Sequence, residues 1–445
     1  MLPLSDKTRR RITLGLFVVL CVSPTVIVAA WGISRQLPWH VRGEAQRLGW
    51  QLGMKVSLAA VHHPRPGVVR YEGLVLANPE TGQEVVRCRV LEAAWESAGD
   101  GRGPGAARLM LSATEPEVEA AALDEVRLLV DRVLAGRAGP WDAGVRLTAE
   151  SLLIRSGQSP QTLTDLKCSI ESLPEGTLAK LDFRLPGQSA PKPAWVYLGR
   201  YRQQAAPVSV VGLDTGPSAL PCSVLALVVE GLATLGPQSA FRGGIDGRET
   251  ADGWEVVASG QFEEVELERL VAERLPSYQL SGKAQITIEQ AVLLDGRLQK
   301  ARGTLIGGPG EANAALLDAA VQRLGLTRSP DLGSFDRAIH YDLLAAEFLL
   351  DGEGLRMRGL CDEGRRGTIL AGRQGPILGQ PRLQPLPMAA LVRALVADGP
   401  AGSSASGEVE RILRRMPVPG IAGVGGVPGG SPSAQARRIR EPEPR

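Results

Sequence analysis

The chain has 445 residues, with 50 Lys or Arg against 48 Asp or Glu, so its formal net charge is only +2. A dedicated nucleic-acid binder would show a basic excess gathered on one face, and the near balance argues against that class. Apolar residues make up 44% of the chain and aromatic residues only 4%, which predicts a core built from Leu, Val, Ile and Ala. The length favours roughly two or three domains.

An uncharged run, "ITLGLFVVLCVSPTVIVAAWGI", occupies residues 12–33 and follows a short tail, residues 1–11, that contains a basic cluster. As a helix this run is long enough to cross about 30 Å of hydrocarbon, so we expect a transmembrane signal-anchor. The basic cluster predicts a cytoplasmic N-terminus and an exported remainder. The alternative is a cleaved signal peptide, because residues 28–30, "VAA", resemble a cleavage site.

Cysteine and histidine usage gives no signature of a metal or redox site. The five cysteines are widely spaced, at Cys21, Cys88, Cys168, Cys222 and Cys361. The last four leave two possibilities open, two disulfides in an oxidising compartment or buried free thiols. Adjacent residues on a strand point to opposite faces, so His62 and His63 are not expected to share a metal ion. We expect no metal and no cofactor.

Residues 36–95 are expected to form an amphipathic helix followed by the first β-hairpins. Apolar residues between 41 and 52 recur at helical spacing, and Gly53 allows an exit into an extended segment. In "EVVRCRV", the apolar residues Val86, Cys88 and Val90 alternate with arginines, which predicts a half-buried strand. The preceding "NPETG", residues 78–82, has the composition of a turn.

Two further regions, residues 96–239 and 240–396, are expected to be β-rich with short helices. Asp-Gly pairs at 246–247, 252–253, 295–296 and 351–352 separate alternating apolar runs, and this is a strong hairpin signal. Helices are predicted at 122–134, 263–275 and 311–326 from apolar stripes at helical spacing. Residues 397–445 are rich in Gly, Pro and Ser and predict a disordered tail. The fold class is therefore mainly β with short helices, an α+β fold in which a transmembrane helix precedes a curved antiparallel sheet of hairpins.

No catalytic motif is present in the sequence. The nearest pattern is "GGPGEANAALLDAA", residues 307–320, which places glycines before a helix but lacks the Lys-Ser/Thr ending of a phosphate-binding loop. A plain loop-to-helix junction explains this pattern better. We therefore expect a protein that is not an enzyme and has no catalytic residues.

The order of these parts resembles the AsmA-like family, which includes the TamB-type envelope proteins. The resemblance is carried by the anchor, by "LGMKVSLAAV" with "PGVVRYEGLVLANPETGQEVVRCRVLEAAW", and by the hairpins and helix within residues 240–380. It implies an inner-membrane protein whose bulk lies in the periplasm, with a β-groove that takes part in phospholipid transport or outer-membrane assembly. Its motifs are loose hydrophobic and turn patterns, and the family has no catalytic residues to carry over.

Within such a groove, the residues expected to face acyl chains are Val86, Cys88, Val90, Ile286 and Ile288. An apolar strand face is ordinarily covered as core, so a filled core and an open groove both remain possible from the sequence. A further alternative is a structural scaffold: an anchored β-domain that binds another envelope protein.

Overall fold

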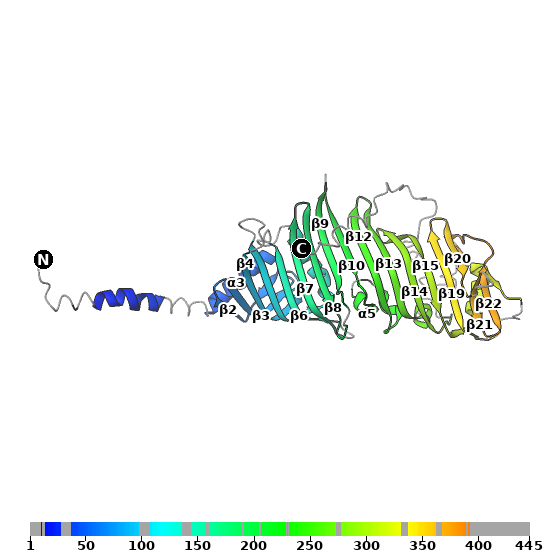
Figure 1. The fold of residues 1–445 in the computed structure, drawn as a ribbon, viewed down its shortest axis with the longest axis horizontal. Coiled ribbons are helices and arrows are strands. Elements are labelled where there is room, and N and C mark those ends of the chain that lie inside the picture. The colour runs from blue at the N-terminus through cyan, green and yellow to red at the C-terminus, as the bar shows by residue number, and fades with distance from the viewer. Residues whose placement is uncertain are drawn as a thin grey trace. The chain divides into compact units, whose positions relative to one another are not determined.

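The computed structural model describes residues 10, 14–27, 37–97, 107–135, 144–156, 160–188, 191–203, 206–227, 229, 231–272, 277–330, 337–361, 367–388 and 390–391. The chain divides into two compact units. Figure 1 labels their helices and strands. The first unit contains residues 1–233 and 237–251, and the second contains residues 234–236 and 252–445. Both are mainly β with short helices, which confirms the predicted fold class at that level.

The first unit contains most of the helices. Its helices are η1 (Val18–Val22), α3 (Pro38–Leu52), η2 (Ala120–Ala122), α4 (Leu123–Leu134) and α5 (Cys222–Leu225), and η4 (Leu232–Leu235) follows at its end. Its strands are β1 (Lys55–Ser57), β2 (Ala60–Arg65), β3 (Val68–Ala77), β4 (Glu84–Ser97), β5 (Ala107–Glu119), β6 (Val145–Arg155), β7 (Gln161–Leu173), β8 (Gly176–Arg184), β9 (Ala194–Gln203), β10 (Ala206–Asp214), β11 (Leu220–Pro221) and β12 (Ala240–Thr250).

The expected transmembrane anchor, residues 12–33, is described only in part, and the structure does not support it as a membrane span. Residues 14–27 are helical, and among the described residues no helix is long and apolar enough to cross a membrane. Helix α3 starts with Pro38 at its first position and ends at Gly53, whose φ of 64° is the left-handed conformation that glycine adopts without strain. The turn at 78–82 is held by Asn78, whose side-chain oxygen accepts hydrogen bonds from the backbone N–H groups of Glu80 and Thr81.

The sheet of the first unit is mixed, which corrects the expectation of a purely antiparallel sheet. Strand β3 pairs with both β1 and β2, and antiparallel neighbours then follow from β3 to β5. Strands β5 and β6 are parallel, because the chain returns through α4 rather than through a tight turn. From β6 the sheet continues antiparallel through β7, β8, β9 and β10 to β12.

The second unit contains the helices α6 (Leu267–Ala272) and α7 (Ala314–Leu324). Its strands are β13 (Gly253–Glu266), β14 (Lys283–Leu294), β15 (Arg297–Gly307), β16 (Gly310–Ala312), β17 (Leu326–Arg328), β18 (Ile339–Tyr341), β19 (Leu343–Asp351), β20 (Gly354–Gly359), β21 (Thr368–Gly372) and β22 (Gly375–Pro381). Antiparallel pairing runs from β13 through β14, β15 and β19 to β20, and β19 also pairs with β21.

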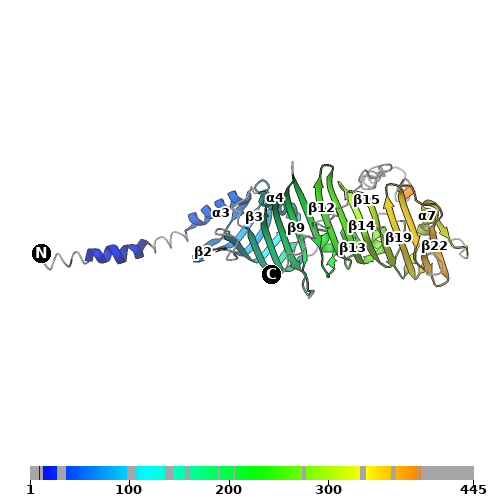
Figure 2. The same ribbon diagram turned by 45° about the horizontal axis from the view of Figure 1, so that its top comes forward.

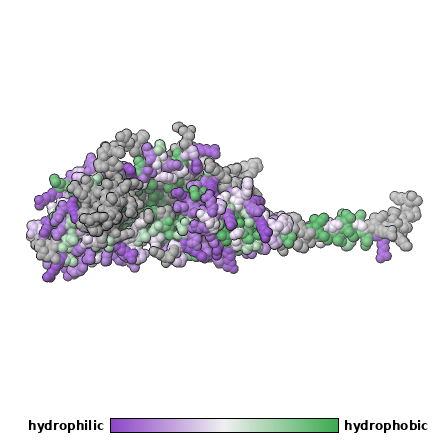
Figure 3. Space-filling view, turned by 180° about the vertical axis from the view of Figure 1, so that it is seen from behind, coloured by the Kyte–Doolittle hydropathy of each residue, from purple (hydrophilic) through white to green (hydrophobic). Residues whose placement is uncertain are grey.

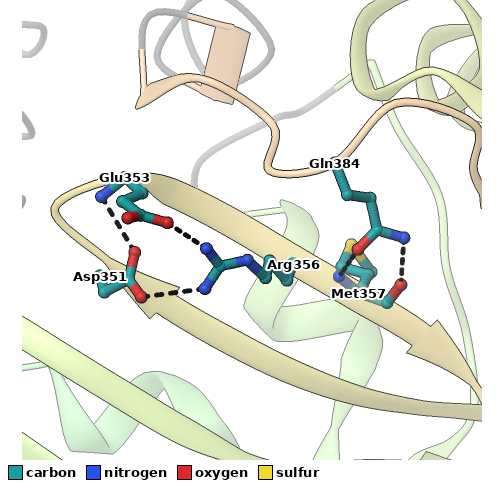
Figure 4. A network of polar contacts seen from close by, with 5 residues as sticks. All are labelled: Asp351, Glu353, Arg356, Met357 and Gln384. Carbon is teal, nitrogen blue, oxygen red and sulfur yellow. Dashed lines mark hydrogen bonds and ion pairs between the residues drawn. The ribbon is translucent and has the colours of Figure 1, made fainter.

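The predicted hairpins of the second unit are largely confirmed. Asp295-Gly296 forms the two-residue turn between β14 and β15, and Gly352-Glu353 forms the turn between β19 and β20. In the second turn, Asp351 accepts a hydrogen bond from the backbone of Glu353, and Arg356 pairs with both carboxylates (Figure 4). Asp252-Gly253 lies where β12 ends and β13 begins, as expected.

Two predictions about local structure are wrong. Asp246-Gly247 lies inside β12 and forms no turn, because both residues pair directly with β10. The helix predicted at 263–275 is short: residues 263–266 extend β13, and only Leu267–Ala272 are helical, with residues 273–276 outside the described residues. The predicted tail, residues 397–445, also lies outside the described residues.

The core of the second unit lies under α7. Leu317 and Tyr341 are each only 1% exposed and pack with residues of β17, β19, β21 and β22. The outer edge of β20 is covered by the chain after β22, where Gln384 hydrogen-bonds the backbone N–H and C=O of Met357 at 3.1 and 2.7 Å (Figure 4). A covered edge cannot pair with another chain, so this end of the sheet is closed.

Candidate functional site

The feature that stands out in the first unit is one continuous row of apolar side chains across the sheet. Directly paired residues of neighbouring strands lie on the same face, so a row can be followed from strand to strand through the register. The row takes one residue from each strand from β3 to β10 and one from β12, and every member is apolar. Its members are Val69, Ala93, Leu111, Leu147, Cys168, Leu181, Val196, Leu213 and Ile245. We call it the apolar row.

The neighbouring row on the opposite face has the opposite chemistry. It is shifted by one residue in every strand and is made mostly of charged or polar residues. Its members are Arg70, Glu92, Ser112, Thr148, Lys167, Asp182, Trp195, Asp214 and Gly244. We call it the polar row. Because adjacent residues in a strand point to opposite faces, the two rows show that one face of this sheet is apolar and the other polar.

The apolar row is half-buried along its whole length. None of its members is fully buried, and none is fully exposed. On the same face, the row that contains Tyr71 is mostly buried: Tyr71 is 5% exposed, Ala113 and Ala149 are 8% exposed and Leu166 is 4% exposed, while Leu91 between Tyr71 and Ala113 is half-buried. The apolar face is therefore packed along one side, whereas the apolar row keeps part of its surface accessible.

Two helices contribute to the packed side. Helix α3 lies next to the start of the sheet (Figure 2). Tyr71 is buried, and its hydroxyl accepts a hydrogen bond from the side chain of Arg47 of this helix. Burial, with a smaller contribution from Glu44, raises the pKa of Tyr71. Helix α4 contacts both β4 and β8, and Arg132 near its end donates a hydrogen bond to the carbonyl oxygen of Gly53 at 2.9 Å.

On the apolar face, the core-facing side chains switch between odd-numbered and even-numbered positions where the backbones of β3 and β5 adopt positive φ. Gly73 in β3 and Glu115 in β5 have φ values of 61° and 51° and lie opposite Arg89 of β4. Tyr71 and Leu74 are both buried although they are three residues apart, so the side chains that face the core change from odd to even positions there. Arg89 pairs with Glu115 at 3.1 Å, and both side chains are exposed.

The same arrangement recurs at two other acidic residues with positive φ. Asp165 in β7 has a φ of 58° and pairs with Arg184 at 3.4 Å. Glu264 in β13 has a φ of 55° and pairs with Lys283 at 2.6 Å. Non-glycine residues rarely adopt this conformation, so a kink that recurs three times, each time with an ion pair at the acidic residue, is a regular feature of these sheets.

The change of parity decides where the predicted site residues of β4 lie. Val86 pairs with Leu76 and Val118, and Cys88 pairs with Leu74, so both lie on the apolar face. Val90 lies beyond the kink, pairs with Glu72 and Thr114, and lines a shallow polar depression of about 320 Å³ with Arg70, Arg89, Glu92 and Ser112. The structure therefore does not bring Val90 together with Val86 and Cys88.

The thiols on the apolar face are neutral. Burial raises the pKa of the Cys88 thiol. Burial, with a smaller contribution from the negative charge of Asp182, raises the pKa of the Cys168 thiol to about 11. Both thiols therefore stay protonated at neutral pH and behave as small apolar groups. All five cysteines are free, and Cys88 and Cys222 are buried.

The predicted site residues of β14 lie on a second apolar face, in the second unit. Ile286 pairs with Phe262 and Leu305, and Ile288 pairs with two glycines. These isoleucines are half-buried, whereas Ala346, which pairs with Leu305, is 4% exposed in the core under α7. Thr287, between the two isoleucines, points to the opposite face. The directly paired row that contains it is polar and consists of Gln261, Thr287, Thr304, Glu347 and Arg358.

The two adjacent histidines point to different neighbours. His62 lies 3.6 Å from the carboxylate of Glu72, whereas the ring of His63 lies 6.1 Å from that of His40. Within the residues that the structure describes, no three His, Cys, Asp or Glu side chains form a cluster that could hold a metal ion.

On the face seen in the space-filling view, apolar side chains (green) lie between hydrophilic ones (purple) (Figure 3). Comparisons with models of known protein families, with curated proteins and with solved structures found no match.

The apolar row was missed by sequence reasoning because strands β9 and β10 carry no turn signal and the register across strands cannot be read from one sequence.

Proposed function

We propose that this chain is a non-enzymatic, membrane-anchored envelope protein of AsmA-like type that binds phospholipid acyl chains on the apolar face of its sheet. The observation that carries the proposal is the apolar row, whose members from β3 to β12 are all apolar and all half-buried. Side chains of a filled core would be buried, as those under α7 are. The half-buried row leaves apolar surface available for a ligand.

The dimensions of the row suit an acyl chain. The row crosses eight gaps between neighbouring strands, each about 4.8 Å wide, so on a flat sheet it would be about 38 Å long. The hydrocarbon core of a bilayer is about 30 Å thick, so one acyl chain spans about 15 Å. Each methylene group removed from water contributes about 0.8 kcal/mol, so a chain lying along the row is held without any polar contact.

The polar row supports the same proposal. Its charged residues keep the other face in water, and ion pairs such as Arg155–Glu117 and Lys180–Asp182 lie outside the apolar row. A protein that passes acyl chains between membranes needs such a one-sided sheet, because the lipid is shielded on one face while the other remains soluble. Phospholipid transport, or support of outer-membrane assembly, follows as the proposed role.

The proposal places the anchor, residues 12–33, in the inner membrane, the N-terminus in the cytoplasm and the rest of the chain in the periplasm. The basic cluster before the apolar run is the feature that supports this orientation. A phosphatase reporter that folds only outside the cytoplasm, fused after residue 391, is expected to be active. An inactive reporter, with an active cytoplasmic reporter at the same position, would contradict the orientation.

Two matched pairs of variants test lipid binding. Leu111→Asp and Leu147→Asp place a charge in the apolar row, whereas Ser112→Asp and Thr148→Asp place the same charge on the adjacent residue of the polar row. The full chain is purified in mild detergent, and the phospholipid that remains bound is counted by mass spectrometry. We expect the two row variants to lose bound phospholipid and the two controls to keep it. Equal retention in all four folded variants, checked by circular dichroism, would reject the proposal.

A further inference from the structure

Helix α3 exposes two tryptophans on one stripe. Trp50 is 92% exposed and Trp39 is 63% exposed. They are eleven positions apart, which is three helical turns, so they lie above one another at a separation of about 16 Å along the helix axis. Arg42, Gly43 and Gln46 lie between them at helical spacing, and all three are exposed. We call this set the tryptophan stripe.

The stripe is not the packed side of α3. The helix contacts β1 and β2 on its other side. There Gly49 approaches the backbone so closely that an added Cβ would lie 2.9 Å from the carbonyl oxygen of Met54. Glu44 pairs with Arg47 at 2.8 Å, and Arg47 also hydrogen-bonds Tyr71. The helix is therefore held to the sheet without help from either tryptophan.

The chemistry of the stripe matches the interface of a bilayer. Tryptophan is enriched where membrane meets water, because its ring is apolar and its N–H still needs a polar partner. The stripe adds the positive charge of Arg42 and contains no acidic residue. Basic charge next to exposed aromatic rings favours an anionic lipid surface over a neutral one.

The position of α3 in the chain also fits a lipid surface. Nine residues separate the apolar helical segment 14–27 from Leu37, so even a fully extended connection reaches no more than about 36 Å. We infer that α3 lies in the interface of an anionic phospholipid bilayer, with Trp39 and Trp50 inserted among the headgroups. This inference rests on the proposed membrane anchor, but it concerns a surface separate from the apolar row and does not require lipid to bind there.

Depth-dependent fluorescence quenching tests the inference on the full chain. The protein is reconstituted into vesicles of phosphatidylcholine and phosphatidylglycerol that contain lipid brominated on the acyl chain near the headgroup. The wild type is compared with Trp50→Phe and with the control Trp254→Phe, which removes a 38% exposed tryptophan of β13. We expect Trp50→Phe to remove part of the emission that bromolipid quenches, and Trp254→Phe to leave that part unchanged.

Two results would overturn the inference. The first is that Trp50→Phe leaves bromolipid quenching unchanged and instead removes emission that aqueous iodide quenches, which would place Trp50 in water. The second is that Trp50 is shielded from both quenchers, which would place a protein on the stripe. Bound phospholipid is counted by mass spectrometry on Leu111→Asp purified in mild detergent, and the same variant is then reconstituted for quenching. Loss of the apolar-row ligand with retained bromolipid quenching at Trp50 would separate the two proposals.

A charge variant tests the preference for anionic lipid. Arg42→Gln is expected to remove the difference in Trp50 quenching between vesicles with and without phosphatidylglycerol. The matched control is Arg89→Gln, whose side chain is 71% exposed on the polar face of the sheet and should leave that difference intact. If the difference persists in Arg42→Gln, the stripe does not select anionic headgroups.

Discussion

The hydroxyl group of Tyr341, in the core of the second unit, should stabilise the fold by an amount that depends on pH. Tyr341 is 1% exposed, and its hydroxyl donates a hydrogen bond to the carbonyl oxygen of Ser281 at 2.5 Å. Burial raises the pKa of Tyr341 to about 12, compared with 10.0 in water. Tyr341→Phe removes this hydrogen bond, so it should cost about 0.5–1.5 kcal/mol of unfolding free energy at pH 8.

This cost should disappear as the pH rises. Between about pH 10 and pH 12 the unfolded tyrosine loses its proton and the folded one keeps it, so the unfolded state binds fewer protons. The wild type then loses up to about 1.4 kcal/mol of stability per pH unit, whereas the phenylalanine variant has no such loss. The stability contributed by Tyr341 is therefore complete below pH 10 and is lost as the pH rises toward 12.

The assay is urea unfolding of both proteins at intervals from pH 8 to pH 12, followed by circular dichroism, with separate transitions fitted for the two units. The free-energy gap between wild type and Tyr341→Phe should shrink above pH 10 and close or reverse near pH 12. Alkaline effects on other groups cancel in this difference. A gap that stays constant over the whole range would refute the reasoning, because the hydroxyl would then ionise equally in both states.

Three further stability predictions follow from burial and capping. Leu317→Ala in α7 should cost about 2–5 kcal/mol of unfolding free energy, while Leu128→Ala, at a side chain that is 51% exposed, should stay within about 0.5 kcal/mol. Val86→Asn should destabilise the first unit by about 1–3 kcal/mol in urea unfolding, whereas Val90→Asn, on the polar side of the same strand, should be close to neutral; equal losses would contradict the change of parity. Asn313 accepts a hydrogen bond from the N–H of Leu316 at the start of α7, so Asn313→Ala should lower the melting transition by an amount equivalent to about 1 kcal/mol, and no change would mean that the cap is dispensable.

The hairpins were the part of the fold that the sequence predicted best. Asp295-Gly296 forms a turn because its two residues accept positive φ, at 48° and 73°, between strands of alternating polarity. Asp246-Gly247 has the same composition but lies within β12, where pairing with β10 outweighs the turn preference of the dipeptide. A local signal is reliable only where the strands on both sides of it pair with each other.

The face of each strand was harder to predict. Alternation in "EVVRCRV" places Val86, Cys88 and Val90 on one side, but the kink opposite Glu115 moves Val90 to the polar face. No sequence signal marks Glu115, because glutamate, unlike glycine, asparagine or aspartate, is not favoured at positive φ. Its conformation is stabilised by the surrounding sheet and by the ion pair with Arg89, which is 26 positions away in the chain.

The parallel pairing of β5 with β6 was also missed. The helix at 122–134 was predicted, but its role as a crossover depends on which strands it joins. A helix between two strands permits parallel pairing because the chain can return to the same edge of the sheet. The apolar row depends on this pairing, since Leu111 and Leu147 are brought side by side only in the parallel register.

The most direct test of the central claim is a photocrosslinking scan along β9 in the native membrane. A photoreactive amino acid replaces, one at a time, Trp195, Val196, Tyr197 and Leu198, which alternate between the two faces of the sheet. An open apolar face predicts phospholipid adducts at 196 and 198 and none at 195 and 197. Adducts at all four positions, or at none, would show that the apolar row does not hold acyl chains.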